Sequence, residues 1–187
     1  CTGAGSTSNI NACTRIIQRG ESSDSDLSVA YSNRGLAHSN GGDNDSAIAD
    51  LDQALRLDPR NAIAYNNRGF TYNNKGEHDR AIADLDQAIA LNPENDTAYN
   101  RAIADATRVI ELDPANATAF NSRSSSLIFK GDYERAIADA TRAIELSPNS
   151  GNDFNNRGRA YLEKGEYSLA IGDLTRAIEL NPKSANP

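Results

Sequence analysis

Asparagine side chains recur along the chain, and they are the first candidates for a chemical role. Asparagine is a poor residue for the interior of a helix, because its side chain competes for backbone hydrogen bonds. Its amide group both donates and accepts hydrogen bonds, so a row of asparagines offers a row of polar binding groups. The recurring residues are Asn33, Asn66, Asn67, Asn100, Asn121, Asn155 and Asn156.

Arginine and aspartate recur together at a constant separation. Each of four arginines is followed 16 residues later by an aspartate, in the pairs Arg34–Asp50, Arg68–Asp84, Arg123–Asp139 and Arg157–Asp173. Across a hairpin of two helices, this offset can bring the two side chains together. Because the guanidinium head is planar and has several donors, we predict that these arginines bridge helices, to the aspartates or to main-chain carbonyls. The alternative is a row of arginines that binds anions.

Residues suited to catalysis or to metal binding are few and scattered. His38 and His78 stand alone, without Cys, His or carboxylate partners at the spacing of metal ligands, so surface or helix-end roles are expected for them. The sequence has no G-x-S-x-G motif, no phosphate-binding glycine loop and no H-E-x-x-H motif. We therefore predict a protein that is not an enzyme, with no catalytic residues, no metal and no cofactor.

Both cysteines, Cys1 and Cys13, lie in the first segment of the chain. In an oxidising compartment they can form a disulfide, which would stabilise the fold by about 3 kcal/mol. The alternative is two free thiols, with Cys13 packed as a small buried hydrophobic residue. The chain contains no methionine and starts at Cys1, which a cleaved secretory signal or another trimmed start would explain. An exported location, periplasmic or secreted, is therefore favoured over a cytoplasmic one.

The overall charge and hydropathy limit the classes of partner. The formal net charge of −7 argues against nucleic acid, which requires a basic stripe. No run of 18 apolar residues is present, so no membrane span is expected.

The elements that position these side chains belong to an internal repeat. The stretch Ala62–Pro93 returns with changes along most of the chain. A proline closes each successive copy: Pro59, Pro93, Pro114, Pro148 and Pro182. Three of the four steps between these prolines are 34 residues long, and the step from Pro93 to Pro114 is 21. Within a copy, apolar residues recur at three- and four-residue spacing on two segments, which predicts two amphipathic helices. Residues 19–26 are expected to form a loop. The helices are expected at about 27–40 and 46–57, 62–74 and 78–91, 117–129 and 133–146, and 152–163 and 167–180.

This period resembles the tetratricopeptide repeat family, and large, small and aromatic residues at fixed offsets carry the resemblance. In the best copy these are Tyr65, Gly69, Tyr72, Ala81, Leu85, Ala88 and Pro93. The resemblance covers about residues 27–182 and implies an all-α fold, a right-handed α-solenoid of antiparallel helix pairs. The expected layout is a tail and capping half-repeat (1–26), repeats at 27–59, 60–93, 94–114 (partial), 115–148 and 149–182, and a tail (183–187).

The third copy is interrupted. Residues 94–100 match residues 60–66, Arg101 then matches Arg80, and the 13 residues equivalent to 67–79 are absent. If the loss is real, Thr97–Leu112 becomes one long helix and breaks the alternation of helices. Alternatively, the protein contains these residues and they are missing from this sequence.

The resemblance implies that the first helix of each pair lines a concave groove. A row of asparagines there could bind the backbone of an extended peptide with little regard to its sequence. The alternative is that the amides are solvated or bond neighbouring helices. The candidate groove residues are Asn33, Asn66, Asn67, Phe70, Asn73, Asn121, Ile128, Asn155, Asn156 and Arg159.

We therefore predict a protein–protein interaction module that binds an extended peptide or a helix of a partner in this groove. The alternative is a structural module that assembles with a second copy, through the C-terminal helix or the interrupted third repeat, as a homodimer.

Overall fold

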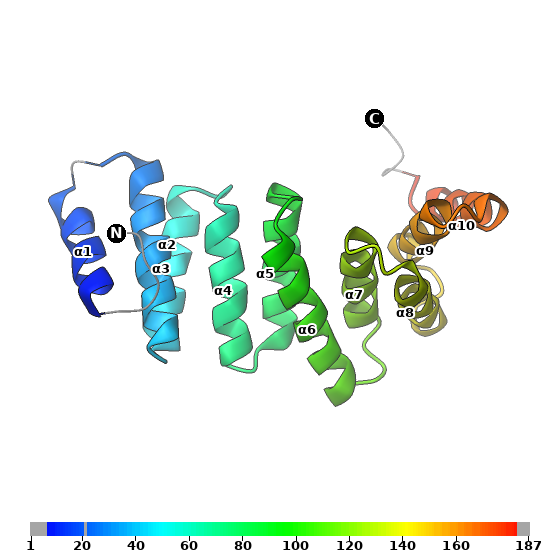
Figure 1. The fold of residues 1–187 in the computed structure, drawn as a ribbon, viewed down its shortest axis with the longest axis horizontal. Helices are drawn as coiled ribbons and strands as arrows, with labels where there is room; N and C mark the ends of the chain where they lie inside the picture. Colours follow the sequence, from blue (N-terminus) through cyan, green and yellow to red (C-terminus); the bar gives the residue numbers. More distant parts are fainter. Residues whose placement is uncertain (1–6, 21, 183–187) are drawn as a thin grey trace. The chain divides into compact units, whose positions relative to one another are not determined.

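The structure is a computed structural model that describes residues 7–20 and 22–182, and all regular elements in these residues are α-helices (Figure 1). This confirms the predicted all-α class. The helices are α1 (Thr7–Arg19), α2 (Asp24–Asn40), α3 (Asn44–Leu57), α4 (Ala62–Asn74), α5 (His78–Leu91), α6 (Asp96–Leu112), α7 (Ala117–Phe129), α8 (Tyr133–Leu146), α9 (Gly151–Glu163) and α10 (Tyr167–Leu180).

The chain forms two compact units, unit 1 (residues 1–101) and unit 2 (residues 102–187). In unit 1, each helix from α1 to α4 packs against the next, and α2 also packs against α4. In unit 2, α7 packs on α8, α8 on α9 and α9 on α10, while α7 also contacts α9. Each unit therefore consists of consecutive helix pairs in which the first helices, α2 and α4 or α7 and α9, touch one another.

Short polar residues fix where most helices begin, because they satisfy backbone N–H groups that have no partner inside the helix. The Asn61 side chain accepts a hydrogen bond from the backbone N–H of Ala64 at 2.9 Å, and Asn116 caps α7 in the same way. The prediction for α4, α5, α7, α8 and α10 agrees with the observed bounds, whereas α3 begins two residues and α9 one residue earlier than predicted. Local sequence is sufficient for these boundaries.

The predicted loop over Arg19–Asp26 is wrong at its end, because α2 begins at Asp24 rather than at Leu27. The side chain of Ser23 caps this helix: its Oγ accepts from the backbone N–H of Asp26 at 3.1 Å and donates to the Asp26 carboxylate at 2.6 Å. This reciprocal pair is a capping box, in which the acidic side chain reaches back toward the cap residue.

The interrupted third copy forms a single helix. α6 runs without a break from Asp96 to Leu112, one residue earlier at its start than the predicted helix Thr97–Leu112. The origin of the missing 13 residues stays a prediction. The boundary between the two units falls inside α6, after Arg101.

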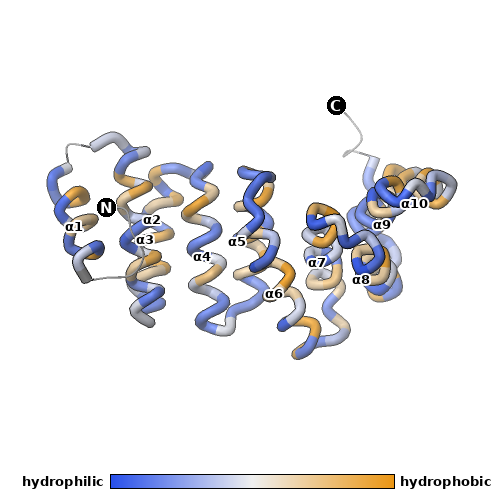
Figure 2. Tube along the Cα trace, in the orientation of Figure 1, coloured by the Kyte–Doolittle hydropathy of each residue, from blue (hydrophilic) through white to orange (hydrophobic). Residues whose placement is uncertain are grey.

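The helices of a pair cross closely where one of them carries glycine. A Cβ placed on Gly35 would lie 2.7 Å from the Cγ of Leu51, and one on Gly158 would lie 2.8 Å from the Cγ of Leu174. No side chain fits there without displacing a core leucine. Figure 2 shows hydrophilic and hydrophobic residues alternating along every helix, as expected when each helix buries one side.

Cys13 lies on α1 and is fully buried. Cys1 lies outside the described residues, so the disulfide between Cys1 and Cys13 stays a prediction. Within residues 7–20 and 22–182, no helix combines the length and the apolar character needed to cross a membrane.

Candidate functional site

The four arginines of the 16-residue pairs all bind the aspartates that follow them. In the first pair, Nε and Nη2 of Arg34 donate to the two carboxylate oxygens of Asp50, both at 2.7 Å. The pair Arg123–Asp139 has the same two bonds at 2.7 and 2.8 Å. Arg68–Asp84 and Arg157–Asp173 repeat this geometry. This two-bond contact between guanidinium and carboxylate ties the two helices of a pair together.

The remaining Nη1 group of each arginine reaches a third helix. Nη1 of Arg123 donates to the hydroxyl of Thr107 at 3.0 Å, and Nη1 of Arg68 donates to the carboxylate of Asp52 at 2.6 Å. The corresponding acceptors of Arg34 and Arg157 are Thr14 and Thr141. Each arginine thus links its own helix, its partner helix and the preceding one, a contact that the sequence analysis did not find.

We call these contacts the arginine clamps. Each guanidinium also lies over the aromatic ring three residues earlier, with the Arg34 head 5.3 Å from the centre of the Tyr31 ring. The hydrogen bond to Asp50 raises the pKa of Arg34, and Asp173 has the same effect on the pKa of Arg157. The guanidinium heads are already bound to carboxylates. The structure therefore favours the interpretation that these arginines bridge helices, rather than the alternative that they form an anion-binding row.

The predicted asparagines divide into two groups by position. Asn67 is 4% exposed, and its amide donates to the hydroxyl of Ser32 on the neighbouring first helix at 3.2 Å. Asn156 is also buried, and it donates to the carbonyl of Asn121 at 3.4 Å. Asn33, at the same repeat position as Asn67, is half-buried. Asn67 and Asn156 thus join neighbouring first helices, which is the structural alternative stated for the row.

Two further amides make the same kind of contact between α4 and α2. Asn61 donates to the hydroxyl of Ser28 at 2.9 Å, and Asn74 donates to that of Ser39 at 3.2 Å. These residues were missed because they lie at the ends of α4, outside the recurring position. A serine on the preceding first helix, 33 or 35 residues earlier, is the signal in the sequence.

The second group of asparagines lies one residue earlier in each copy and is more accessible. Asn66 and Asn121 are half-buried, and Asn155 is exposed. The Oδ1 atom of Asn66 accepts a hydrogen bond from Nη1 of Arg101 at 3.0 Å. The same guanidinium lies 4.7 Å from the centre of the Phe70 ring. Arg101 therefore holds two of the predicted groove residues in place.

These accessible residues form one face of their helices, because residues three and four positions apart lie on the same side. On α4 the face consists of Ile63, Asn66, Phe70 and Asn73. Its first member, Ile63, is 61% exposed, and the others are half-buried. We call this face the first-helix stripe of unit 1, and its equivalents on α7 and α9 the first-helix stripe of unit 2.

The equivalent face of α9 is also accessible. Its residues are Asn152, Asn155, Arg159 and Leu162. Leu162 is 46% exposed, and the Arg159 guanidinium lies 5.3 Å from the centre of the exposed Phe129 ring of α7.

The stripe on α7 differs at its end. There the face consists of Thr118, Asn121, Ser125 and Ile128. Ile128 is 6% exposed and belongs to a hydrophobic cluster with Leu127, Ala136 and Ala160. Ile128 is therefore a core residue rather than an open contact.

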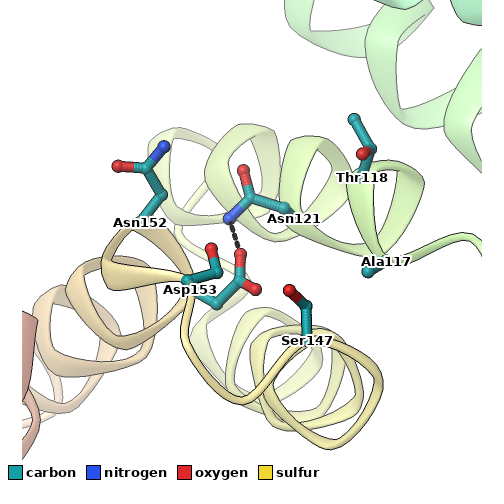
Figure 3. A pocket seen from close by; sticks show the side chains of 7 residues that line it. Ala117, Thr118, Asn121, Ser147, Asn152 and Asp153 are labelled. Atoms are coloured by element: carbon teal, nitrogen blue, oxygen red, sulfur yellow. Dashed lines mark hydrogen bonds between the residues drawn. The ribbon is translucent and has the colours of Figure 1, made fainter. Parts of the chain in front are cut away.

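A polar pocket of about 180 Å³ lies between α7 and α9 (Figure 3). Figure 3 shows the carboxylate of Asp153 pointing toward Asn121 and Ser147, and the amide of Asn121 donates a hydrogen bond to it. Burial raises the pKa of the Asp153 carboxyl, although hydrogen bonds from Ser150 and Asn121 oppose this effect. Asp153 was not among the residues predicted from the sequence.

Neither histidine belongs to a metal site. His38, in the last turn of α2, has its Nδ1 atom 3.5 Å from a carboxylate oxygen of Asp43. His78 begins α5. In the part of the chain that the structure describes, no group of three His, Cys, Asp or Glu side chains is arranged to hold a metal ion.

Paired helices that stack on their neighbours, with small residues at the crossings, define the class of helical-repeat proteins. Profiles of the tetratricopeptide repeat match residues 32–96, 97–151 and 153–184, which is most of the chain. The chain therefore belongs to the tetratricopeptide repeat family.

Several solved structures are similar to the chain. The structure described as "YrrB: a TPR protein with an unusual peptide-binding site" is 23% identical, with 93% of this chain and 94% of that chain covered and a TM-score of 0.46. A crystal structure of MamA is 26% identical, covering 81% and 96% of the two chains at a TM-score of 0.45. MamA from Desulfovibrio magneticus RS-1 is 19% identical, covering 85% and 97% at a TM-score of 0.42. No curated protein matches the chain.

Proposed function

We propose that this chain is a non-enzymatic protein–protein interaction module and that the first-helix stripe of each unit binds an extended segment of a partner protein. Membership of the tetratricopeptide repeat family supports a role in protein–protein interaction. The observation that carries the proposal is the face of α4, where the apolar side chains of Ile63 and Phe70 alternate with the amides of Asn66 and Asn73.

The amides and the apolar side chains have different tasks in this proposal. The asparagines bond the backbone of the partner, because an amide can both donate to a carbonyl and accept from an N–H group. Arg101 holds the Oδ1 atom of Asn66, and the Nδ2 group of that amide is thereby oriented. Ile63 and Leu162 are exposed apolar contacts for side chains of the partner.

Not every predicted residue belongs to this surface. Asn67, Asn156 and Ile128 are buried, and they hold the helices together. Asn33 shares the repeat position of Asn67 and lies outside the stripe. The candidate contacts of the proposal are Asn66, Phe70, Asn73, Asn121, Asn155 and Arg159.

Selection from a displayed library of random peptides tests this function. We expect the full chain to select peptides, and Asn66→Ala and Asn155→Ala to weaken their binding by about two- to tenfold each, the effect of one lost hydrogen bond. Gln87→Ala is the matched control, because Gln87 is an exposed amide on a second helix. Calorimetry gives the affinities, and circular dichroism checks that the variants stay helical. The proposal is contradicted if no peptide is selected, or if the asparagine variants bind as well as the control.

Self-assembly is the second candidate function, and exposed apolar side chains on α10 favour it. Ile171 is 67% exposed, whereas Ile137, at the same position of the previous repeat, is half-buried. Tyr167, Leu169 and Ile178 of α10 are exposed as well. A second copy of the chain would cover this face; assembly through the interrupted third repeat is the other form of this hypothesis.

Light scattering over a range of concentrations separates this function from peptide binding. Self-assembly predicts a mass that rises with concentration, that falls to the monomer in Ile171→Glu, and that is unchanged in Ser168→Glu, an exposed position of the same helix. A monomer at every concentration rules out this function.

A further inference from the structure

Asp153 places a carboxylate where the other repeats have a small apolar residue. It occupies the same repeat position as Ala64 and Ala119, both of which are fully buried. Asp153 is itself only 3% exposed. Burying a carboxylate costs free energy unless a hydrogen-bonding or charged partner compensates for the lost water. The last repeat therefore carries a costly group at a position where alanine is sufficient for packing.

The partners of Asp153 are neutral, which distinguishes it from the aspartates of the arginine clamps. Its carboxylate accepts hydrogen bonds from the Asn121 amide and from Ser150. Asp139 and Asp173, by contrast, each bind a guanidinium through two bonds. No lysine, arginine or histidine of the described residues lines the pocket beside Asp153.

The space beside this carboxylate is small, and most of the residues that line it are polar. Its volume of about 180 Å³ is below the several hundred Å³ of typical small-molecule sites, and it suits the end of a single side chain. Its lining residues are Ala117, Thr118, Asn121, Ser147, Ser150, Asn152 and Asp153. Figure 3 shows Asn121 and Ser147 beside the Asp153 carboxylate. Such a wall offers hydrogen-bond acceptors and one negative charge.

The pocket opens on the first-helix stripe of unit 2. Thr118 and Asn121 belong to the stripe on α7, and Asn152 begins the stripe on α9. A peptide that lies on this stripe therefore passes the pocket and can place a side chain in it.

We propose that the pocket at Asp153 selects a lysine side chain of the bound partner, whose ammonium group pairs with the carboxylate. An ammonium group has three donors and no acceptor, and it is compact, so it matches a small pocket with several oxygen acceptors. A guanidinium is planar and prefers two parallel bonds to a carboxylate, and Asn121 already occupies one oxygen of Asp153. This inference rests on the proposed function, since it names the chemistry that the same surface selects.

A small probe tests the pocket separately from peptide binding. In a ¹H–¹⁵N NMR titration of the full chain with n-butylammonium, we expect saturable shifts at the amides of Asn121, Asn152 and Asp153, absent with n-butanol at the same concentration. Asp153→Asn removes the charge with little change of shape, and Asp153→Ala restores the residue of the other repeats. Both variants should lose the response. Glu163→Gln, an exposed acid on the same helix, should keep it.

Peptides selected by the wild-type chain provide a second test of the lysine pocket. We expect lysine to be enriched at one position of these peptides. Asp153→Asn should weaken the binding of the peptides by at least about tenfold, because the lysine then lacks its charge partner. Unchanged affinity in Asp153→Asn, no n-butylammonium response in the wild type, or a stronger response to n-propylguanidinium each overturns the assignment. If the chain responds to n-butylammonium but selects no peptides, the proposed function fails and the pocket chemistry stands.

Discussion

Replacing Arg123 by methionine should destabilise the protein strongly, and replacing its partner at the same time should remove most of the effect. Arg123 donates to both carboxylate oxygens of Asp139 at 2.7 and 2.8 Å, and the two side chains are only 15% and 10% exposed. Arg123→Met therefore leaves a nearly buried carboxylate without its cation. In Arg123→Met with Asp139→Ala, no buried charge is left behind.

The expected magnitudes follow from this burial. Removing one partner of a buried pair costs about 3–5 kcal/mol, and the small remaining exposure of Arg123 and Asp139 favours the lower end, about 3 kcal/mol. Replacing both partners by apolar residues is often neutral, so we expect the double variant to lie within about 1 kcal/mol of the wild type. The coupling energy of the pair is then about 2 kcal/mol or more.

Urea unfolding followed by circular dichroism measures these differences, with the two single variants and the double variant forming a double-mutant cycle. The matched control is Arg142→Met. Arg142 pairs with Glu145 at 2.8 Å on the surface of the same unit, where both side chains are about half exposed. A pair of this kind contributes roughly 0–1 kcal/mol.

Two results would refute the reasoning. One is a cost of Arg123→Met no greater than that of Arg142→Met, which would show that burial of the pair does not matter. The other is a double variant whose loss equals the sum of Arg123→Met and Asp139→Ala, which would show that the two side chains act independently.

Three further predictions concern packing, pH and the cysteines. Gly35→Ala should lower the free energy of unfolding in urea by about 1–3 kcal/mol, because its Cβ would lie 2.7 Å from a leucine of α3. Gly172→Ala meets open space in α10 and should instead raise this free energy by up to about 1 kcal/mol. Equal effects of the two substitutions would contradict this account. Since burial raises the pKa of the Asp153 carboxyl, the ionised form costs stability at neutral pH, so Asp153→Asn should be more stable than the wild type at pH 7. It should lose this advantage as the pH falls through the raised pKa to the ordinary value of 3.8, and keep none below it; an advantage that grows on acidification would be the wrong sign. Reduction of a Cys1–Cys13 disulfide should add the mass of two hydrogen atoms and lower the free energy of unfolding by about 3 kcal/mol, and an unchanged mass would exclude the disulfide.

The sequence alone determines the helices and most of their ends, because these depend on interactions within a few residues. The 34-residue period, the apolar spacing and the capping residues predict α4, α5, α7, α8 and α10 with the bounds that the structure has. The start of α2 was missed although its signal is also local: Ser23 and Asp26 form a capping box that had been assigned to a loop.

The arginine clamps could be predicted only in part from the sequence. The constant offset of 16 residues is enough to propose that Arg123 meets Asp139, because one hairpin geometry repeats along the chain. The contact of Arg123 with Thr107 joins two repeats, and it depends on how neighbouring hairpins stack. No spacing within one hairpin reveals that contact.

Tertiary structure decided which recurring polar residues are open to a partner. Asn66 and Asn67 are neighbours in sequence, yet one lies on the accessible stripe and the other is buried against Ser32, because successive residues of a helix point about 100° apart and only packing sets which direction is covered. Burial likewise distinguishes Asp153 from the exposed acids of the chain. The sequence supplies the chemistry of each side chain, and the arrangement of the helices determines which of them can use it.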